Sequence, residues 1–216
     1  MNKHTEAILK KMESSAYIDL HLDFAIKLTN ESERGAILIG SSKVEKYLKE
    51  LIVKVLPSKQ KKYVERLFDY PGPLSSFSGK IELSYAFGLI GNEVYKALNT
   101  LRRIRNDAAH SDETFELKNI SSELDKIYAF EYGFPEVVHV QTHKSLFNWK
   151  KENARDALTK ANLIDNIDFE KLWNEKLPDP EKSEIFQEHL RVWKLAYGLT
   201  LLCLKLEVIK DERANL

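Results

Sequence analysis

Apolar residues recur at spacings of three and four along most of the chain, and this period places them on one face of an α-helix. Residues 33–56 show it most clearly, through Ile37, Val44 and Leu48, and Pro57 ends that predicted helix. We therefore expect an all-α helical bundle of about six to eight helices, forming a single domain over residues 1–216. The further predicted helices cover residues 17–28, 59–68, 77–89, 92–110, 145–161, 169–175 and 181–210.

One segment departs from the helical period. Residues 136–143 alternate apolar and polar side chains and include β-branched valines, which predicts a short strand or an extended loop. Two prolines flank Gly72 in residues 69–73, so this stretch is expected to form a turn. Pro178 and Pro180 indicate a linker before the last helix. The expected architecture is a helical bundle with at most one short extended segment.

The composition suits a folded chain with a large core. Hydrophobic residues make up 43% and charged residues 31% of the 216 residues, and a chain of this length buries roughly 70% of its extended surface. The lone cysteine, Cys203, excludes a disulfide framework and a zinc site built from cysteines. No apolar run approaches the ~20 residues that cross a bilayer, and the charged N-terminus lacks the apolar core of a signal peptide. We expect a soluble, cytoplasmic protein with no membrane association.

Opposite charges are concentrated in different segments, although the net charge is +0. Residues 43–66 hold eight basic and three acidic side chains, for a net +5, whereas residues 111–136 hold seven acidic and two basic ones, for a net −5. These segments are either solvated helix faces, complementary patches that meet between two protomers or, for the first, a surface for a polyanion. The overall balance argues against a protein whose main role is gripping duplex DNA, because such proteins usually carry a basic excess.

Several residues with reactive side chains have a structural explanation. His139 and His143 are four residues apart and share a face in a helix or a strand, but no third ligand accompanies them. We therefore expect no metal and no cofactor. His189 lies on the apolar stripe of the last predicted helix, which indicates an interior histidine, and Cys203 among leucines indicates an inert buried thiol. The tryptophans are expected to anchor the core: Trp149, Trp173 and Trp193.

The candidate for chemistry lies near the end of the helix predicted before the acidic segment. Arg105 and His110 are five positions apart, which is about 140° of rotation on a helix, and Asn106 follows the arginine. If the helix ends or distorts at the intervening alanines, both groups reach one pocket. His110 would then exchange protons with an RNA 2′-hydroxyl or the leaving oxygen, Arg105 would stabilise the phosphorane charge, and Asn106 would orient the histidine or the phosphate. Alternatively, His110 interacts with the helix dipole. Arg105 then pairs with Asp107 or Asp112.

Three stretches resemble the bacterial mannitol-repressor family in order and spacing: residues 31–35, residues 67–78 with 80–90, and residues 101–110. The run Asp-Tyr-Pro-Gly-Pro-Leu and the Phe-Ser that follows it are the most specific element, and the resemblance covers about residues 17–115. It implies an all-helical regulator of sugar-uptake operons. No turn-linked helix pair here is followed by a basic recognition face. We therefore expect a transcriptional repressor of the mannitol-operon type that contacts a regulatory protein partner rather than reading an operator directly.

The spacing of Arg105, Asn106 and His110 also resembles the signature of HEPN-type ribonucleases and RNA-binding modules, in which Arg and His of two protomers form one cleft. This resemblance implies an alternative function, a metal-independent endoribonuclease or toxin that acts on RNA with these three residues as its catalytic group. One Arg–His pair on one helix is too little to surround a phosphodiester, and a two-fold contact would bring each group opposite its mate. We therefore predict a homodimer with Arg105 and His110 at or near its interface, whichever function holds.

Overall fold

The computed structural model describes residues 3–110, 115–176 and 183–213. These residues form an all-α helical bundle, and no strand occurs among them. The predicted fold class is thereby confirmed. The α-helices are α1 (Lys3–Met12), α2 (Ser15–Thr29), α3 (Glu33–Val55), α4 (Lys61–Phe68), α5 (Phe77–Ala86), α6 (Asn92–His110), α7 (Ser121–Tyr128), α8 (Phe134–Lys160), α9 (Phe169–Lys171) and α10 (Glu184–Arg213). Short helical turns are η1 (Leu117–Ile120), η2 (Ile164–Asn166) and η3 (Leu172–Lys176).

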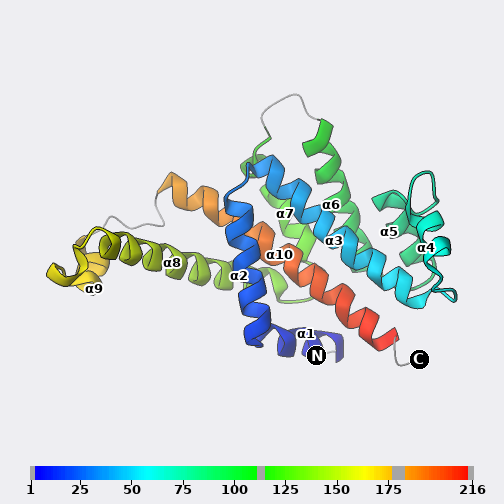
Figure 1. Ribbon diagram of the computed structural model, residues 1–216, viewed down its shortest axis with the longest axis horizontal. Coiled ribbons are helices and arrows are strands. Elements are labelled where there is room, and N and C mark those ends of the chain that lie inside the picture. The colour runs from blue at the N-terminus through cyan, green and yellow to red at the C-terminus, as the bar shows by residue number, and fades with distance from the viewer. Residues whose placement is uncertain (1–2, 111–114, 177–182, 214–216) are drawn as a thin grey trace.

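Helix α10 is the central element of the body (Figure 1), and α1, α2, α3, α7 and α8 all pack against it. Its residues from Val192 to Leu206 are almost all buried, as a helix surrounded by others requires. Two glycines allow close approach of the backbones. A Cβ at Gly40 on α3 would overlap the side chain of Leu199, and a Cβ at Gly198 on α10 would overlap the ring of Tyr128.

Serine caps determine where three of the predicted helices begin. The hydroxyls of Ser14, Ser32 and Ser76 accept hydrogen bonds from the backbone N–H groups three residues later, at the starts of α2, α3 and α5. Such caps satisfy an N–H that has no partner within the helix. Helix α3 ends just before Pro57, as the sequence predicted. The prolines at 178 and 180 lie outside the described residues.

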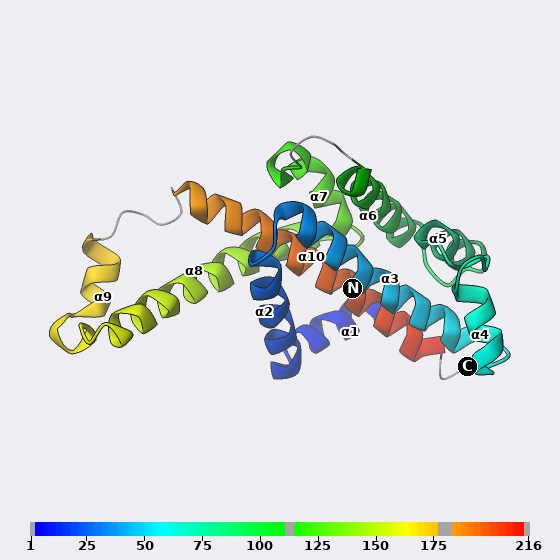
Figure 2. The same ribbon diagram turned by 45° about the horizontal axis from the view of Figure 1, so that its top comes forward.

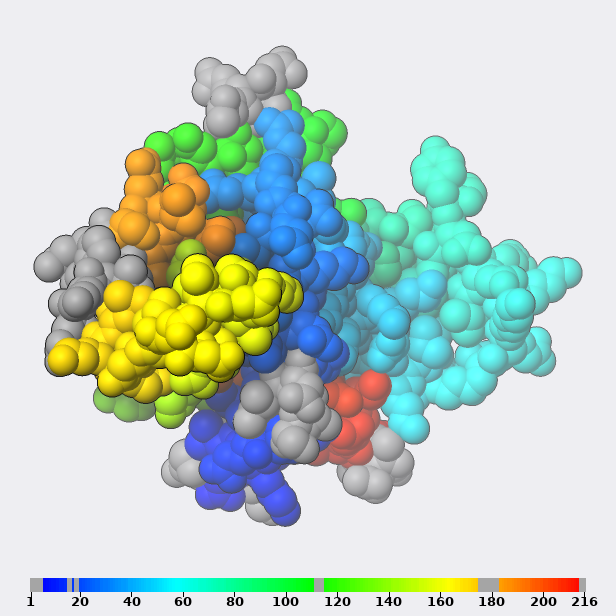
Figure 3. All heavy atoms as spheres, turned by 60° about the vertical axis from the view of Figure 1, so that its left-hand side comes forward, coloured from blue at the N-terminus to red at the C-terminus, as the bar shows by residue number. Residues whose placement is uncertain are grey.

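The predicted turn at residues 69–73 joins α4 to α5, and this α4–α5 segment stands out from one side of the body (Figures 1 and 3). Gly72 is required by close approach, because a Cβ there would overlap the backbone carbonyl oxygens of Arg66, Leu67 and Asp69. The N–H of Leu74 donates to the carbonyl of Leu67 at 2.9 Å, which closes the turn. The turn therefore has a fixed shape that its Pro-Gly-Pro sequence permits.

The prediction of an extended segment at residues 136–143 is wrong, because these residues lie within α8. The valines that alternate with polar residues also contribute to a helical period: Val138, Thr142 and Leu146 are buried at spacings of four. Gly133, with φ of 82°, and Pro135 in the first turn start the helix. Its distal half extends away from the body towards α9 (Figures 1 and 2). Among the described residues, no helix combines the length and apolar character needed to cross a membrane.

Candidate functional site

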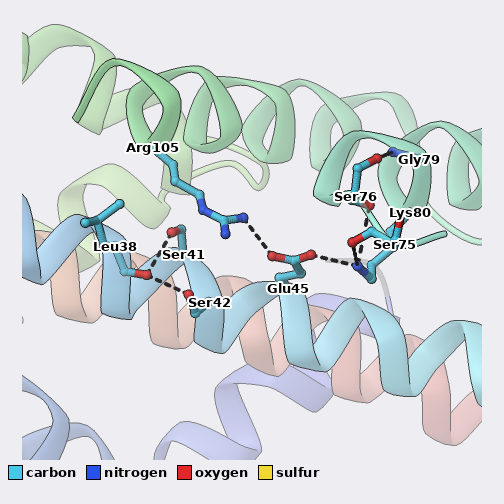
Figure 4. A network of polar contacts seen from close by, with 9 residues as sticks. All are labelled: Leu38, Ser41, Ser42, Glu45, Ser75, Ser76, Gly79, Lys80 and Arg105. Atoms are coloured by element: carbon cyan, nitrogen blue, oxygen red, sulfur yellow. Dashed lines mark hydrogen bonds and ion pairs between the residues drawn. The ribbon is translucent and has the colours of Figure 1, made fainter. Parts of the chain in front are cut away.

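Arg105 belongs to an ion network that joins three helices (Figure 4). Its Nη1 donates to Oε2 of Glu45 on α3 at 2.7 Å, and Nζ of Lys80 on α5 donates to Oε1 of the same carboxylate at 2.7 Å. The Lys80 ammonium also donates to the backbone carbonyls of Ser75 and Ser76, at 3.2 and 3.4 Å. Two cations therefore share one carboxylate at the junction of α3, α5 and α6.

Burial differs strongly across this network. The side chain of Lys80 is 5% exposed, that of Glu45 18% and that of Arg105 32%. A buried ammonium is tolerated only when it is paired and hydrogen-bonded, and Glu45 with the two serine carbonyls meets that need. The guanidinium of Arg105 lies 5.9 Å from the ring centroid of Phe77, so one side of it is covered. Lys80 is thus a structural cation, whereas Arg105 keeps a solvent-accessible part.

The cap at the start of α5 is part of the same network. Ser76 caps α5 by accepting from the N–H of Gly79 at 3.0 Å, and this places the serine carbonyls beside Lys80. The start of α5 and the C-terminal part of α6 therefore meet around Glu45 on α3. The carboxylate holds the α4–α5 segment and α6 on one side of α3.

Arg105 and His110 do not converge within one chain. Helix α6 is continuous through the two alanines to His110, so the five-residue separation leaves the two side chains about 140° apart. Asn106 and His110 are both exposed and, at a spacing of four, lie on one face of the helix. A pocket shared by Arg105 and His110 would require the helix to break at the two alanines, and α6 does not break there.

Among the described residues, Arg105 does not pair with Asp107, one of the two acids that the sequence offered as its partner. Asp107 instead lies 3.8 Å from Arg103, which also contacts Glu123 on α7 at 2.7 Å. Asp112 lies outside the described residues. The side chain of Arg105 points towards α3, where its guanidinium bonds to Glu45 and lies beside the ring of Phe77.

The two charged segments make their contacts within themselves or with other helices, and no ion pair joins the two segments in the part of the chain that the structure describes. In the basic segment, the ammonium of Lys43 lies over the ring of Phe24, and that of Lys49 lies over the ring of Phe68. Lys46 forms an ion pair with Glu50, and Lys61 forms one with Glu65. Lys59 donates hydrogen bonds to backbone carbonyls at the end of α3. In the acidic segment, Glu116, Glu123 and Glu131 pair with Lys118, Arg103 and Lys205. Contacts within the segments and pairs with neighbouring helices account for these residues.

His139 and His143 share a face of α8, with ring centroids 4.6 Å apart. Within residues 3–110, 115–176 and 183–213, no group of three histidine, cysteine, aspartate or glutamate side chains is placed to hold a metal ion. The pair is therefore a ring contact on the helix surface. His143 also lies 6.2 Å from the ring of Phe186 on α10, which places it at the α8–α10 contact.

The remaining singled-out residues follow the structural predictions only in part. Trp149 is half-buried against the core, and Trp173 packs with Phe147 and Phe169 outside the main core cluster. Trp193 is fully buried and donates its indole N–H to Thr29 at 2.9 Å. Cys203 is buried, and this burial raises the pKa of its thiol to about 12, as an inert thiol requires. His189 is not interior: it is half-buried beside Trp149, its Nδ1 has no hydrogen-bond partner, and partial burial with the charge of Lys150 lowers its pKa.

Sequence reasoning missed Glu45 and Lys80 as site residues. In the sequence, Glu45 is one of three acids in a basic segment, and neither it nor Lys80 belongs to a recognisable motif for chemistry. One signal could have pointed to Glu45: it is an acidic residue that lies between the buried positions Val44 and Leu48 of α3, about one turn after Ser41. Comparison with family models, curated proteins and solved structures finds no match to this chain. What the chain does is therefore inferred from the geometry around Glu45 and from the exposed residues nearby.

Proposed function

We propose that this protein is a transcriptional regulator of the mannitol-repressor type that acts in the cytoplasm through contact with a protein partner. The observation that carries the proposal is the exposure of aromatic side chains on the α4–α5 segment. Tyr70 is 91% exposed at the tip of the 69–73 turn, and Phe87 is 72% exposed just after α5. Aromatic residues are enriched where proteins bind proteins.

The turn that carries Tyr70 is firmly anchored. Phe68, Leu74 and Phe77 are all buried on either side of it. Because Gly72 packs against backbone and Lys80 holds the next helix to Glu45, Tyr70 is presented by a backbone of fixed shape. A preorganised anchor loses little entropy when a partner binds, which favours recognition by contact.

The surface beside Tyr70 has the chemistry of a protein interface rather than of a nucleic-acid groove. A groove of about 550 Å³ lies between α4 and the turn. Its lining mixes two basic and two acidic side chains with an aromatic ring and two prolines: Lys62, Glu65, Arg66, Asp69, Tyr70, Pro71 and Pro73, with Gly72. A groove for a polyanion would carry one sign of charge.

The test is a transcript measurement in cells that lack the gene for this chain and are complemented with variants. We expect the wild type to lower transcripts of a mannitol-uptake operon and Tyr70→Ala to lose at least half of that effect. Tyr132→Ala is the matched control, because Tyr132 is also fully exposed but lies before α8. Equal repression by all three chains would contradict a role for this surface.

Direct operator reading is tested with the purified protein. We expect only weak, salt-sensitive binding to the operon's promoter fragment, and tight sequence-specific binding by the protein alone would overturn the partner-mediated form of the proposal.

The alternative, a metal-independent ribonuclease, draws on the exposed face shared by Asn106 and His110. A second copy of the chain would have to add an arginine to that face, since Arg105 of the same chain turns to Glu45. This function predicts growth arrest on overexpression that Arg105→Ala or His110→Ala relieves. The homodimer remains a prediction for either function. Light scattering at micromolar concentration measures it, and a monomeric mass would remove the composite site.

A further inference from the structure

A cavity of about 560 Å³ lies where the link between α5 and α6 meets the C-terminal part of α10. Its lining comes from the stretch of residues 88–94, from Phe130 and Glu131 between α7 and α8, and from Lys205, Ile209 and the last two residues of α10. This volume is in the range of about 300–1,000 Å³ that small-molecule sites occupy. The cavity shares no lining residue with the groove beside Tyr70.

The inner wall of the cavity is apolar and belongs to the core. Val94, Phe130 and Ile209 are each at most 6% exposed and are part of the core cluster. The ring of Phe130 packs edge-on against that of Phe134, with centroids 5.4 Å apart. Because the packing of the bundle fixes these side chains, the cavity has a preformed surface for an apolar group.

Lys205 is the unusual member of the lining, because it is a buried cation with few acceptors. Its side chain is 10% exposed, and its Nζ donates to Oε1 of Glu131, another lining residue, at 2.5 Å. An ammonium has three N–H donors. Among the residues that the structure describes, Glu131 is the one acceptor for them, so two donors remain.

Lys80 shows how a buried ammonium of this chain is satisfied. Its side chain is 5% exposed, and its three donors bond to Glu45 and to the carbonyls of Ser75 and Ser76. Lys205 is nearly as buried, but within the described residues it has one partner instead of three. Buried donors without acceptors are costly. Since both members of the Lys205–Glu131 pair line the cavity, an oxygen acceptor bound beside the pair would supply the missing partner.

The Lys205–Glu131 pair has a positive and a negative end side by side, and this determines the charge of a ligand. An anion near Lys205 is repelled by the carboxylate of Glu131, and a cation near Glu131 is repelled by the ammonium of Lys205. A molecule with both charges can place its carboxylate at the ammonium and its ammonium at the carboxylate. An α-amino acid carries its two charged groups on one carbon, so they are close enough together to match this pair.

Charged residues at the rim of the cavity have partners of their own. Glu93 pairs with Lys96 at 3.0 Å, and Nη2 of Arg213 donates to the backbone carbonyl of Gly88 at 3.0 Å. Both Glu93 and Arg213 are exposed, so water screens their charges. Recognition of a charged ligand therefore rests on the buried Lys205–Glu131 pair.

We propose that this cavity binds a zwitterionic α-amino acid with a large apolar side chain. Its carboxylate accepts from Lys205, its ammonium donates to Glu131, and its side chain lies against Phe130 and Ile209. Charge-assisted hydrogen bonds of this kind are stronger than neutral ones. The proposal does not depend on the regulatory function proposed above.

Three probes that share a phenyl group test the site. L-phenylalanine carries both charges, 3-phenylpropanoate lacks the ammonium, and 2-phenylethylamine lacks the carboxylate. Titration calorimetry on the full chain at pH 7 should give a dissociation constant of about 1 mM or lower for L-phenylalanine. Each analogue should bind at least about tenfold more weakly, since a site built for a polar group rejects a molecule without it.

NMR of the methyl groups locates the bound probe. The methyl signals of Val94 and Ile209 are expected to shift as L-phenylalanine is added, because both side chains line the cavity. Val140 is the internal control, since it is 59% exposed on α8 and is not part of the lining.

Two double variants separate the Lys205–Glu131 pair from other ion pairs. Lys205→Met with Glu131→Gln removes both charges with little change in volume, and it should abolish the preference for L-phenylalanine over the two analogues. Arg103→Met with Glu123→Gln is the matched control, because it removes an ion pair of 2.7 Å between α6 and α7 that lies outside the cavity. Replacing a buried ion pair by neutral groups of similar size is often neutral for stability, and thermal unfolding checks that both variants are folded.

The proposal is overturned if L-phenylalanine does not bind to the wild type, if either analogue binds as tightly, or if Val94 and Ile209 shift no more than Val140. It is also overturned if the folded Lys205→Met, Glu131→Gln variant keeps the preference, or if the control variant loses it as well. If the first double variant does not fold, the comparison of the three probes on the wild type decides.

Discussion

Arg105 near the end of α6 and Glu45 in the middle of α3 are joined by a hydrogen-bonded ion pair of 2.7 Å. The arginine that the sequence offers for phosphate chemistry is therefore already bound to a carboxylate within its own chain. Only Nη1 is engaged by Glu45, so an external anion would have to use the remaining N–H donors on the exposed part of the guanidinium. The ion pair also helps to hold α6 against α3, next to the pair between Glu45 and Lys80 of α5.

Glu45→Gln is expected to lower the free energy of unfolding by about 3–5 kcal/mol, because it leaves the buried ammonium of Lys80 without a counter-charge. Urea unfolding measures the change. Adding Lys80→Met to Glu45→Gln removes the unpaired charge and should restore at least half of the loss. A double variant no more stable than Glu45→Gln alone would show that the charge of Lys80 is not the cause.

Arg105→Ala should cost less, about 1 kcal/mol, because Lys80 still neutralises Glu45 and the arginine is one-third exposed. The matched control is Arg103→Ala on the same helix, which loses a more exposed pair with Glu123 and should change stability by about 0.5 kcal/mol or less. The urea concentrations at the midpoints of unfolding measure the difference in stability between the two variants. A loss for Arg105→Ala as large as that for Glu45→Gln would contradict this ranking of the two cations. The expected small cost means that Arg105→Ala reports on activity rather than on folding in the growth-arrest assay.

Most of the helices were predictable from local signals, although α1 and α7 were not predicted. The site was not predictable in this way. The apolar period of residues 33–56 and Pro57 are local signals, and they placed α3 to within one residue of its end. The pair between Arg105 and Glu45 joins positions sixty residues apart, so it depends on how α3 and α6 pack. No local pattern carries that information.

The error at residues 136–143 has a related cause. Alternating valines are compatible with a strand locally, but burial of Val138 against the rest of the core selects the helix. The sequence did not indicate His21, because a single histidine between two leucines forms no motif with other residues. Its lack of a partner is a property of the folded chain.

Gly40→Ala is expected to destabilise the protein by about 1–3 kcal/mol, because the added methyl group overlaps the side chain of Leu199 where α3 and α10 pack. Thermal or urea unfolding measures the loss. Gly91→Ala is the matched control, since a Cβ there meets nothing within 4 Å, and it should leave stability within about 0.5 kcal/mol of the wild type. Equal effects at the two glycines would show that α3 and α10 are not closely packed at Gly40.

Stability should fall as the pH drops from 6.5 towards 4 because of His21. Burial among α2 and α10, with the charge of Lys43 on α3 nearby, lowers the pKa of His21 from 6.5 to about 4. Between these values the unfolded chain binds a proton that the folded chain does not, so acid favours unfolding. The slope is about 1.4 kcal/mol per pH unit and the total is about 3 kcal/mol; above pH 6.5 this group contributes no pH dependence.

Urea unfolding at pH 7.0, 6.0 and 5.0 measures this dependence before most carboxylates titrate. His21→Phe should flatten the profile, because the variant has no proton to bind in either state. His189→Gln is the control: partial burial also lowers the pKa of His189, but the residue is half-buried and should contribute a smaller part of the slope. A profile that keeps its slope in His21→Phe would mean that the proton is bound elsewhere. Loss of the slope in that variant alone would identify His21 as the imidazole that stays neutral in the folded chain.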